Sequence, residues 1–182
     1  MKTVVYFDCM QSPLGEMVLA SDGDALSGAW FDGQRHQPAA GPAWQRRPDL
    51  PILRRATVQL AEYFAGGRIE FDLPLALAGT PFQREVWHAI AGVRYGETIA
   101  YRELAARAGR PGSIRAAGAA TGRNPLSIIV PCHRIIAAGG ALTGYAGGLA
   151  RKRALLALER PMASAATAPT SVRPAAFAHA ID

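Results

Sequence analysis

A short, mainly apolar run at residues 126–130 ends at Pro131 and is followed at once by Cys132 and His133, and this segment limits how the chain can fold. A second apolar stretch at 135–136 follows, so we expect the thiol and the imidazole to be largely buried. Burying polar side chains costs free energy unless each finds a hydrogen-bond partner. Because proline lacks a backbone donor and ends a regular strand, Pro131 fixes the point at which the thiol is presented.

Two roles for Cys132 follow from this setting. A thiol is a strong nucleophile only as the thiolate, which needs a nearby base, a cation or helix-terminal amides, and His133 and Arg134 are the adjacent candidates. Most buried cysteines, however, are inert core residues. The dipeptide alone leaves both roles open. Two features downstream favour a function, namely the glycine-rich segment 139–148 and a helical pattern that ends at Glu159.

With 182 residues and 49% hydrophobic content, the chain can bury one good core or two small ones. No apolar run is long enough to span a bilayer and the first residues lack a secretory core, so we expect a cytoplasmic protein. The two cysteines, Cys9 and Cys132, lack paired Cys/His spacing, which argues against a disulfide framework or a metal site. The formal net charge of +6 favours a polyanionic partner, although many soluble proteins are equally basic.

The first part of the chain predicts a small domain with an antiparallel sheet and one helix. Turn signals around Pro13 and Gly23 separate three short strand patterns, and residues 34–51 are rich in Pro, Gly, Arg and His and read as a loop. Nothing in this part indicates catalysis, and we interpret Cys9 as an ordinary packed thiol. We expect strands at 3–7, 15–20 and 25–31, a helix at 52–64 and an extended link at 69–77, within an N-terminal α/β domain at 1–75.

From Thr80 the pattern becomes helical, and we expect a mainly helical C-terminal domain at 76–160. Its second and third helices are short and joined by a Gly/Pro turn, which is typical of a helix-turn-helix. The overall fold class is therefore α/β (α+β), and the Ala/Pro/Ser/Thr-rich segment 161–182 predicts a disordered tail. We expect helices at 82–92, 101–108, 114–121, with Ser113 as N-cap, and 149–160.

The third of these helices consists almost entirely of alanine and glycine, with Arg115 as its one long side chain. A helix this narrow could enter the minor groove of DNA, whose hydrogen-bond pattern is degenerate, and scan without sequence preference. The alternative is an alanine-rich packing helix with a solvated arginine. In the last helix, residues 151–153 are basic and Glu159 is acidic, each at the end that the helix dipole disfavours. Either both are solvated, or phosphate neutralises the basic run and His133 pairs with Glu159.

Several motifs together resemble the O6-alkylguanine-DNA alkyltransferases, and the resemblance covers about residues 79–159. The earlier part of the chain resembles that family only in general layout. The motifs are Gly79-Thr80-Pro81-Phe82-Gln83 with Val86-Trp87, Tyr95-Gly96-Glu97-Thr98 with Tyr101, Arg115 to Gly118 before Asn124-Pro125, Pro131-Cys132-His133-Arg134, and Gly144-Tyr145-Ala146-Gly147-Gly148-Leu149.

The resemblance implies direct DNA repair, in which Cys132 accepts the alkyl group from O6 of guanine. It makes His133 the base, acting through a water molecule, with Glu159 orienting the imidazole. Tyr101 would donate to guanine N3, and Asn124 would tie the third helix to the cysteine segment. The product thioether is stable, so the resemblance implies one turnover per molecule and no cofactor.

The resemblance also implies the binding surfaces. The protein, as a monomer, would bind double-stranded DNA in the minor groove without sequence preference and flip the target nucleotide out, with Arg115 filling the gap. The resemblance leaves O4-alkylthymine open as a second substrate. The predicted DNA contacts are Arg115, Tyr101, Arg102, Ala120, Thr121 and Arg123. The predicted base pocket consists of Ile135, Tyr145, Ala146 and Gly147, together with the carbonyl of Cys132.

Three other functions remain to be compared. A non-catalytic relative that binds alkylated DNA and recruits repair factors would lack the nucleophilic cysteine, which is present here. A thiol hydrolase would turn over repeatedly and would draw its base from a separate part of the chain. A helix-turn-helix regulator would bind one defined DNA sequence and would not need Cys132. The chain departs from the family at Ala100, where a hydroxyl residue is common, and it lacks the extra cysteine cluster of the adaptive-response regulators.

Overall fold

A four-stranded sheet forms the first layer of the protein, whose computed structural model describes residues 4–163. Its strands lie in the order β3-β2-β1-β4, with β1, β2 and β3 antiparallel and β4 parallel to β1. The predicted meander is confirmed. Strand β4 falls within the segment expected to be a loop, because a three-residue edge strand has no alternation of its own to reveal it. The strands are Val5–Ser12 (β1), Gly15–Ser21 (β2), Leu26–Phe31 (β3) and Trp44–Arg46 (β4).

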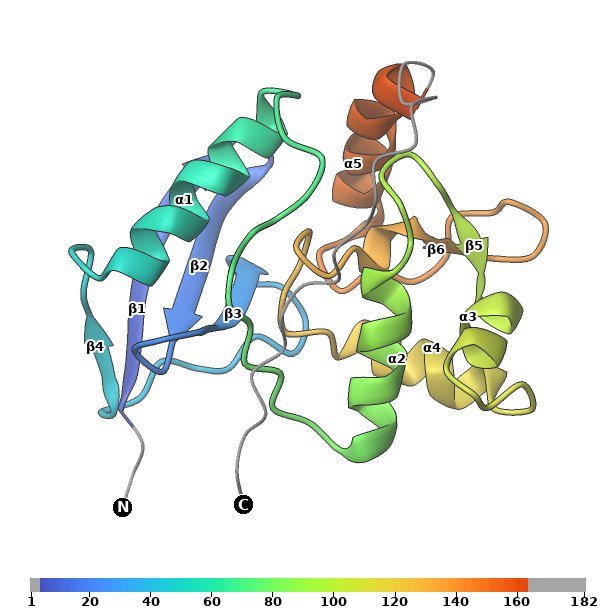
Figure 1. Ribbon diagram of the computed structural model, residues 1–182, viewed down its shortest axis with the longest axis horizontal. Coiled ribbons are helices and arrows are strands. Elements are labelled where there is room, and N and C mark those ends of the chain that lie inside the picture. The colour runs from blue at the N-terminus through green and yellow to red at the C-terminus, as the bar shows by residue number, and fades with distance from the viewer. Residues whose placement is uncertain (1–3, 164–182) are drawn as a thin grey trace.

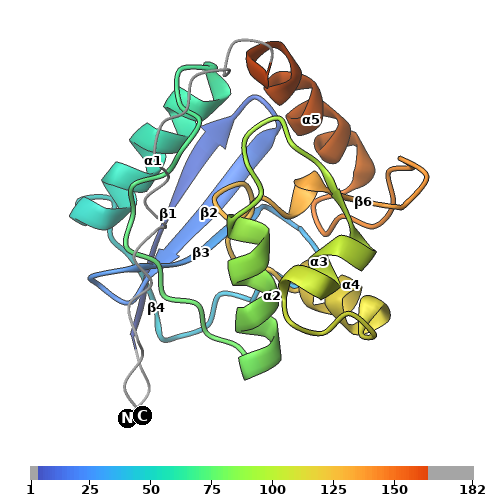
Figure 2. The ribbon, with the colours of Figure 1, turned by 45° about the vertical axis from the view of Figure 1, so that its right-hand side comes forward.

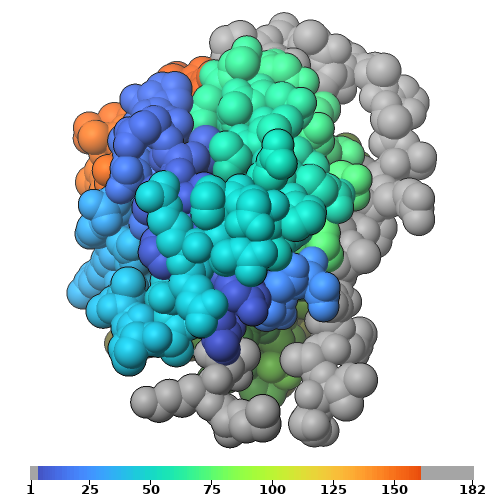
Figure 3. Space-filling model, turned by 90° about the vertical axis from the view of Figure 1, so that its left-hand side faces the viewer, coloured from blue at the N-terminus to red at the C-terminus, as the bar shows by residue number. Residues whose placement is uncertain are grey.

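Helix α1 (Pro51–Phe64) covers one face of this sheet, as the apolar spacing at 52–64 predicts. Pro51 occupies the first turn, where its missing N–H is not needed, and the apolar side is buried from Ile52 to Tyr63. Figure 3 views the molecule from this side, where α1 and the loop before it form much of the surface. Tyr63, near the end of α1, is completely buried and points toward the second part of the chain.

The second part is mainly helical and lies beside the sheet (Figures 1 and 2). Helix α2 begins with a capping box, in which Thr80 and Gln83 bond each other's backbone amides. The predicted pair of short helices, α3 and α4, is present, and Trp87 of α2 holds α4 by donating to the carbonyl of Ala120 at 2.9 Å. The elements are α2 (Pro81–Ala91), β5 (Ile99–Ala100), α3 (Tyr101–Arg107), α4 (Ile114–Gly122), the 3-10 turn η1 (Cys132–Arg134), β6 (Ile135–Ile136) and α5 (Leu149–Ala163).

Two helix ends differ from the prediction. Ser113 precedes α4, but its φ of −99° and ψ of 38° lie outside the extended region that aims a capping oxygen at the first amides, and its side chain makes no cap bond. Helix α5 continues through Pro161 to Ala163, so three residues expected in the tail are helical. The rest of the predicted tail, 164–182, lies outside the described residues.

The two parts share one core. Strand β3 has a free edge, and two later segments pair with it. In the link between the parts, Leu26 donates to the carbonyl of Pro74, and in the second part Ala29 bonds Pro125 and Ser127, each at 2.8 Å. One continuous cluster of buried side chains runs from Phe31 and Tyr63 to Trp87, Cys132 and Leu155. The segment that leads to Cys132 is therefore fixed on the sheet. Within residues 4–163, no helix is long and apolar enough to cross a membrane.

Candidate active site

The chain turns back on itself just before Cys132. Ile128 is buried with a φ of +73°, a left-handed conformation that costs a β-branched residue roughly 1–2 kcal/mol. This turn lets the amide of Val130 donate to the carbonyl of Leu126 at 2.9 Å. Pro131 then precedes the η1 turn, whose first residue, Cys132, has 5% of its surface exposed.

Asn124 connects the end of α4 to the thiol. Its buried amide nitrogen lies 3.1 Å from Sγ of Cys132 and donates to the carbonyl of Val130 at 2.7 Å. Its Oδ1 accepts from the amide of Leu126 at 3.0 Å. One side chain therefore fixes both the loop and the sulfur atom, in the location that the sequence predicts for it.

His133, next to the thiol, is completely buried and bonds a buried carboxylate on α5. Its Nε2 lies 2.8 Å from Oε1 of Glu159. Arg134 forms a bidentate ion pair with the same carboxylate, with Nε 2.9 Å from Oε2 and Nη2 3.0 Å from Oε1. The structure thus brings His133 and Glu159 together as predicted. The other ring nitrogen, Nδ1, is buried and has no hydrogen-bond partner within residues 4–163.

Burial and charge determine the resting protonation of this group. Burial raises the pKa of the Cys132 thiol, against the Asn124 hydrogen bond and the positive charge of Lys152, which lower it. Burial also lowers the pKa of His133, despite the opposing effect of Glu159. Burial favours the neutral form of Glu159, but hydrogen bonds and charges from His133 and Arg134 override it and hold that pKa well below its usual range. The resting site therefore holds a neutral thiol, a neutral imidazole and a carboxylate.

The glycine-rich segment 143–148 is tied to the first part of the chain. The amide of Arg35 donates to the carbonyl of Ala146 at 3.1 Å. Gly147 is buried against two rings: an added Cβ would lie 2.8 Å from Tyr145 and 3.1 Å from Phe31. The buried side chain of Gln34 accepts from Ser127 at 2.9 Å, next to the strained turn. The predicted pocket residues Tyr145, Ala146 and Gly147 are thus held from the sheet side.

The basic run at 151–153 fits neither of our two interpretations as a whole, because two of its three cations are neither solvated nor free to bind phosphate. Lys152 is completely buried, and its Nζ donates to the carbonyls of Ile135 at 2.5 Å and Thr143 at 3.0 Å. Arg151 donates to the carbonyls of Leu14 and Gly147 and lies over the ring of Phe31. Backbone carbonyls of Leu14 and Gly147 therefore satisfy Arg151, and those of Ile135 and Thr143 satisfy Lys152. Of the three, Arg153 is the one that is exposed.

Tyr101 is the first residue of α3 and lies next to the glycine-rich segment 143–148. The parallel pairing of Ile99 with Ile135 in the β5–β6 ribbon brings it there. Its hydroxyl is 3.4 Å from the carbonyl of Thr143 and 3.5 Å from that of Gly144, which are long contacts. Burial raises the pKa of the half-buried Tyr101, so its hydroxyl stays protonated.

The predicted DNA contacts divide into two groups. Arg102, Arg115 and Arg123 are exposed on α3 and α4, and none of them forms a salt bridge with any residue between 4 and 163. The side chains of Ala120 and Thr121 are buried, and the Thr121 hydroxyl donates to the carbonyl of Ala117 at 2.8 Å. The sequence does not reveal this burial, because on so short and alanine-rich a helix the buried side is not marked by larger apolar residues.

Sequence reasoning also missed four residues that hold the site: Gln34, Tyr63, Ser127 and Lys152. Tyr63 belongs to an apolar helix pattern, and its hydroxyl reaches Glu159 through a contact that no local pattern encodes. For Lys152 the sequence did offer a signal: a lysine in the first turn of a helix with an apolar side can be buried if its ammonium meets backbone carbonyls. Within residues 4–163, no group of three or more His, Cys, Asp or Glu is arranged to hold a metal ion.

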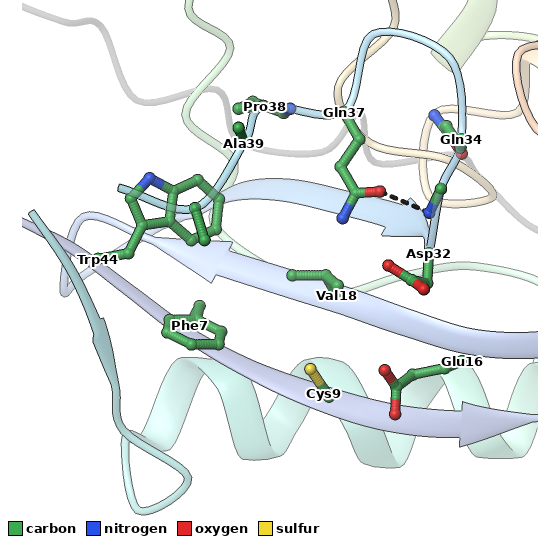
Figure 4. A pocket seen from close by; sticks show the side chains of 12 residues that line it. Phe7, Cys9, Glu16, Val18, Asp32, Gln34, Gln37, Pro38, Ala39 and Trp44 are labelled. Atoms are coloured by element: carbon green, nitrogen blue, oxygen red, sulfur yellow. Dashed lines mark hydrogen bonds between the residues drawn. The ribbon is translucent and has the colours of Figure 1, made fainter. Parts of the chain in front are cut away.

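A hollow of about 460 Å³ opens elsewhere, on the face of the sheet away from α1 (Figure 4). Phe7, Cys9, Val18 and Trp44 line its floor and wall, and Glu16 and Asp32 lie at one end. Burial and the charge of Glu16 raise the pKa of Cys9, so this thiol is a poor nucleophile. Cys132, His133 and Glu159 are not among the lining residues. Both cysteines are free thiols.

Comparison with known proteins gives two family matches. Residues 81–161 match "6-O-methylguanine DNA methyltransferase, DNA binding domain", and residues 5–77 match its "ribonuclease-like domain". The methylated-DNA–protein-cysteine methyltransferase of Mycobacterium tuberculosis is 46% identical over 162 residues, 89% of this chain and 96% of the relative. That of Haemophilus influenzae is 39% identical over 160 residues, 87% of this chain and 88% of the relative.

Solved structures agree. The crystal structure of Mycobacterium tuberculosis OGT in complex with DNA is similar with a TM-score of 0.80 at 45% identity, covering 86% of this chain and 93% of that one. The crystal structure of the Mycobacterium tuberculosis O6-methylguanine methyltransferase is similar with a TM-score of 0.78 at 43% identity, covering 92% of this chain and 97% of that one.

Proposed function

Because the chain belongs to the 6-O-methylguanine DNA methyltransferase family, we propose that it repairs DNA with Cys132 as the acceptor of the alkyl group. The activity is alkyl transfer from DNA to a cysteine. The observation that carries the assignment to Cys132 is a buried thiol 3.1 Å from the amide nitrogen of Asn124 and next in sequence to His133, whose Nε2 lies 2.8 Å from Glu159. The other thiol, Cys9, lies on the sheet without such a base.

His133 takes the proton from the thiol. Its Nε2 is committed to Glu159, so Nδ1 is the nitrogen that accepts, through a water molecule that also contacts the sulfur. Glu159 then stabilises the imidazolium, as the orienting carboxylate does in other nucleophile and base pairs. Because the resting thiol is neutral and buried, the thiolate forms only when this proton moves, which protects Cys132 from other electrophiles.

The thiolate attacks the alkyl carbon in line with the bond to O6. The sulfur–carbon bond forms as the carbon–oxygen bond breaks, and guanine leaves with its charge neutralised by a proton from Tyr101 at N3. Afterwards His133 releases its extra proton to solvent and Tyr101 regains one from solvent, so that no net proton is gained or lost. The long contacts of Tyr101 to the carbonyls of Thr143 and Gly144 are weak enough to be exchanged for the base.

The glycine-rich segment 143–148, which we call the pocket segment, binds the flipped guanine. The carbonyl of Ala146 accepts from the backbone amide of Arg35, which holds this residue in place. The N–H of Ala146 donates to O6 of the guanine. The carbonyls of Cys132 and Ile135 accept from the exocyclic amine of guanine. Each already accepts one bond, from the amide of Ile135 and from Lys152 respectively, and a carbonyl oxygen has a second lone pair to offer. Tyr145 and Gly147 form the apolar wall.

DNA lies along α3 and α4, with α4 in the minor groove. Its alanine and glycine surface allows close approach and reads few base edges, which supports binding without sequence preference. Arg115 fills the gap left by the flipped nucleotide, and Arg102 and Arg123 contact phosphates. The protein acts on duplex DNA as a monomer.

Transfer happens once per molecule. The thioether product has no leaving group that a resident base could release, and the chemistry calls for no cofactor. A duplex with one O6-methylguanine, titrated with protein, tests this: we expect repaired lesions to equal protein molecules and then stop. Cys132→Ala abolishes repair, whereas the matched variant Cys9→Ala repairs as the unaltered protein does.

Three other results of this titration would contradict the proposal. Repair that continues beyond one equivalent would identify a hydrolase. Binding of the damaged duplex with no repair by the unaltered protein would identify a non-catalytic DNA-binding protein. Loss of repair in Cys9→Ala with full repair in Cys132→Ala would place the acceptor on the sheet.

A further inference from the structure

A tyrosine of the first part of the chain donates directly to the carboxylate of the active site. Tyr63, on α1, is completely buried, and its hydroxyl lies 2.7 Å from Oε1 of Glu159. The two residues are 96 positions apart in the sequence. Edge-on contacts with the rings of Phe64 and Tyr95, at 5.5 and 6.1 Å, hold the ring of Tyr63 in this orientation.

We propose that Tyr63 is a positioning residue for alkyl transfer, whose hydroxyl shares Oε1 of Glu159 with His133 and thereby limits how strongly the carboxylate binds the imidazole proton. The inference rests on the proposed function, in which neutral His133 is the base. A carboxylate that held the imidazolium too tightly would leave His133 protonated before the thiol could transfer its proton. The Tyr63 hydroxyl disperses part of that negative charge.

The geometry separates this effect from simple support of Glu159. Arg134 grips both carboxylate oxygens, and the amide of Gly96 donates to Oε2 at 3.2 Å. These bonds fix the carboxylate plane without the tyrosine. Tyr63 and His133 instead bond the same oxygen, Oε1, at 2.7 and 2.8 Å. Removing the Tyr63 hydroxyl therefore changes the charge facing His133 more than it changes the orientation of Glu159.

The other charged or titratable groups around His133 and Glu159 remain in place in such a variant. They are Cys132 and Arg134 in η1, Lys152 on α5 and Tyr95 between α2 and β5. Burial raises the pKa of Tyr63 far above its usual range, with Glu159 adding to the effect, so the Tyr63 hydroxyl keeps its proton across the acid limb of the rate profile. The hydroxyl thus acts as a fixed dipole.

Tyr63→Phe tests the proposal, because it removes the hydroxyl and keeps the ring. Without this donor, Glu159 holds the imidazole proton more tightly and the pKa of His133 rises. Transfer needs neutral His133, so we expect the acid limb of the rate profile to move to higher pH by about 0.5 to 1 unit. Below that limb the rate falls several-fold, and above it the rate stays near that of the unaltered protein.

The measurement is the single-turnover rate of methyl transfer across the acid limb, together with the titration of the His133 ring by nitrogen NMR. Tyr95→Phe is the matched control: it removes a neighbouring hydroxyl, which bonds the carbonyl of Leu158 at 3.3 Å rather than the carboxylate. Its acid limb stays in place. Site-specific 3-fluorotyrosine at position 63 gives a test of opposite sign, because a more acidic phenol is a stronger donor and moves the limb to lower pH.

Shifts of opposite sign for phenylalanine and fluorotyrosine, in both rate and NMR titration, support the proposal. Unchanged midpoints in both variants, with transfer intact in the unaltered protein, overturn it, and so does an equal shift in Tyr95→Phe. If the unaltered protein transfers no methyl group, the proposed function itself fails, and the inference fails with it. If Tyr63→Phe does not fold, the fluorotyrosine variant decides alone.

Discussion

At the scale of single residues, the site depends on groups that adjust protonation rather than on the nucleophile alone. Burial makes Cys132 a poor acid, and Asn124 and Lys152 partly offset this. Lys152 is the only one of the two that carries a charge, and its ammonium is held by the carbonyls of Ile135 and Thr143. Burial in turn lowers the pKa of Lys152 to about 8. At neutral pH Lys152 therefore still carries the positive charge that lowers the pKa of Cys132, but a small rise in pH would remove that charge.

Replacing this cation tests its effect on the thiol. In a Cys9→Ala background, we expect Lys152→Met to raise the pKa of Cys132 by about 0.5 to 1 unit, because the opposing charge is gone. The pH dependence of alkylation by iodoacetamide measures it. Arg153→Met, which removes an exposed cation one residue along the same helix, leaves the midpoint unchanged. Equal shifts in the two variants would mean that general surface charge, not Lys152, acts on the thiol.

At the scale of elements, the pocket segment 143–148 is held against the sheet by close packing. We expect Gly147→Ala to destabilise the protein by about 1–3 kcal/mol and to slow transfer, because its Cβ would lie 2.8 Å from Tyr145 and 3.1 Å from Phe31. Urea unfolding and single-turnover rates measure both effects. Gly139→Ala is the control, since an added Cβ there meets no atom within 4 Å. Equal behaviour of the two variants would contradict the packing account.

In the proposed function, α4 acts on the duplex mainly through Arg115. We expect Arg115→Ala to slow repair of a duplex lesion by about tenfold or more and to leave repair of the same lesion in single-stranded DNA nearly unchanged, because only the duplex requires base flipping. Arg54→Ala, an exposed arginine on α1, serves as the control. An equal loss on both substrates would show that Arg115 contributes charge alone.

At the scale of the whole molecule, the Glu159 carboxylate joins α1, η1 and α5 through Tyr63, His133 and Arg134. Its pKa is depressed in the folded protein from an ordinary value of 4.5. The unfolded chain therefore binds the proton first as pH falls, and the stability that Glu159 contributes is present above about 4.5 and is lost below it. We expect the free energy of unfolding to fall less steeply below that pH in Glu159→Gln. An equal dependence of the free energy of unfolding on pH in the two proteins would contradict this role of Glu159.

Local patterns were sufficient for much of the fold. The meander, α1, α2 and the short helix pair follow from apolar spacing and turn residues. Cys132, His133, Asn124 and Glu159 lie together as the family resemblance implies, which local patterns alone do not predict. What local patterns lack is pairing between distant segments. Strand β4 exists only as an edge on β1, Tyr63 meets Glu159 across 96 positions, and Lys152 finds its carbonyls only after the pocket segment folds over it.

The central claim is that one thiol of this chain, Cys132, receives the alkyl group. Intact-protein mass spectrometry after incubation with a duplex carrying O6-methylguanine tests it most directly, followed by peptide mapping of Cys9 and Cys132. We predict a gain of one methyl group per molecule, located on the Cys132 peptide, saturating at one equivalent and absent in Cys132→Ala. A methyl group on any other residue, or no gain while the duplex is bound, would contradict the account.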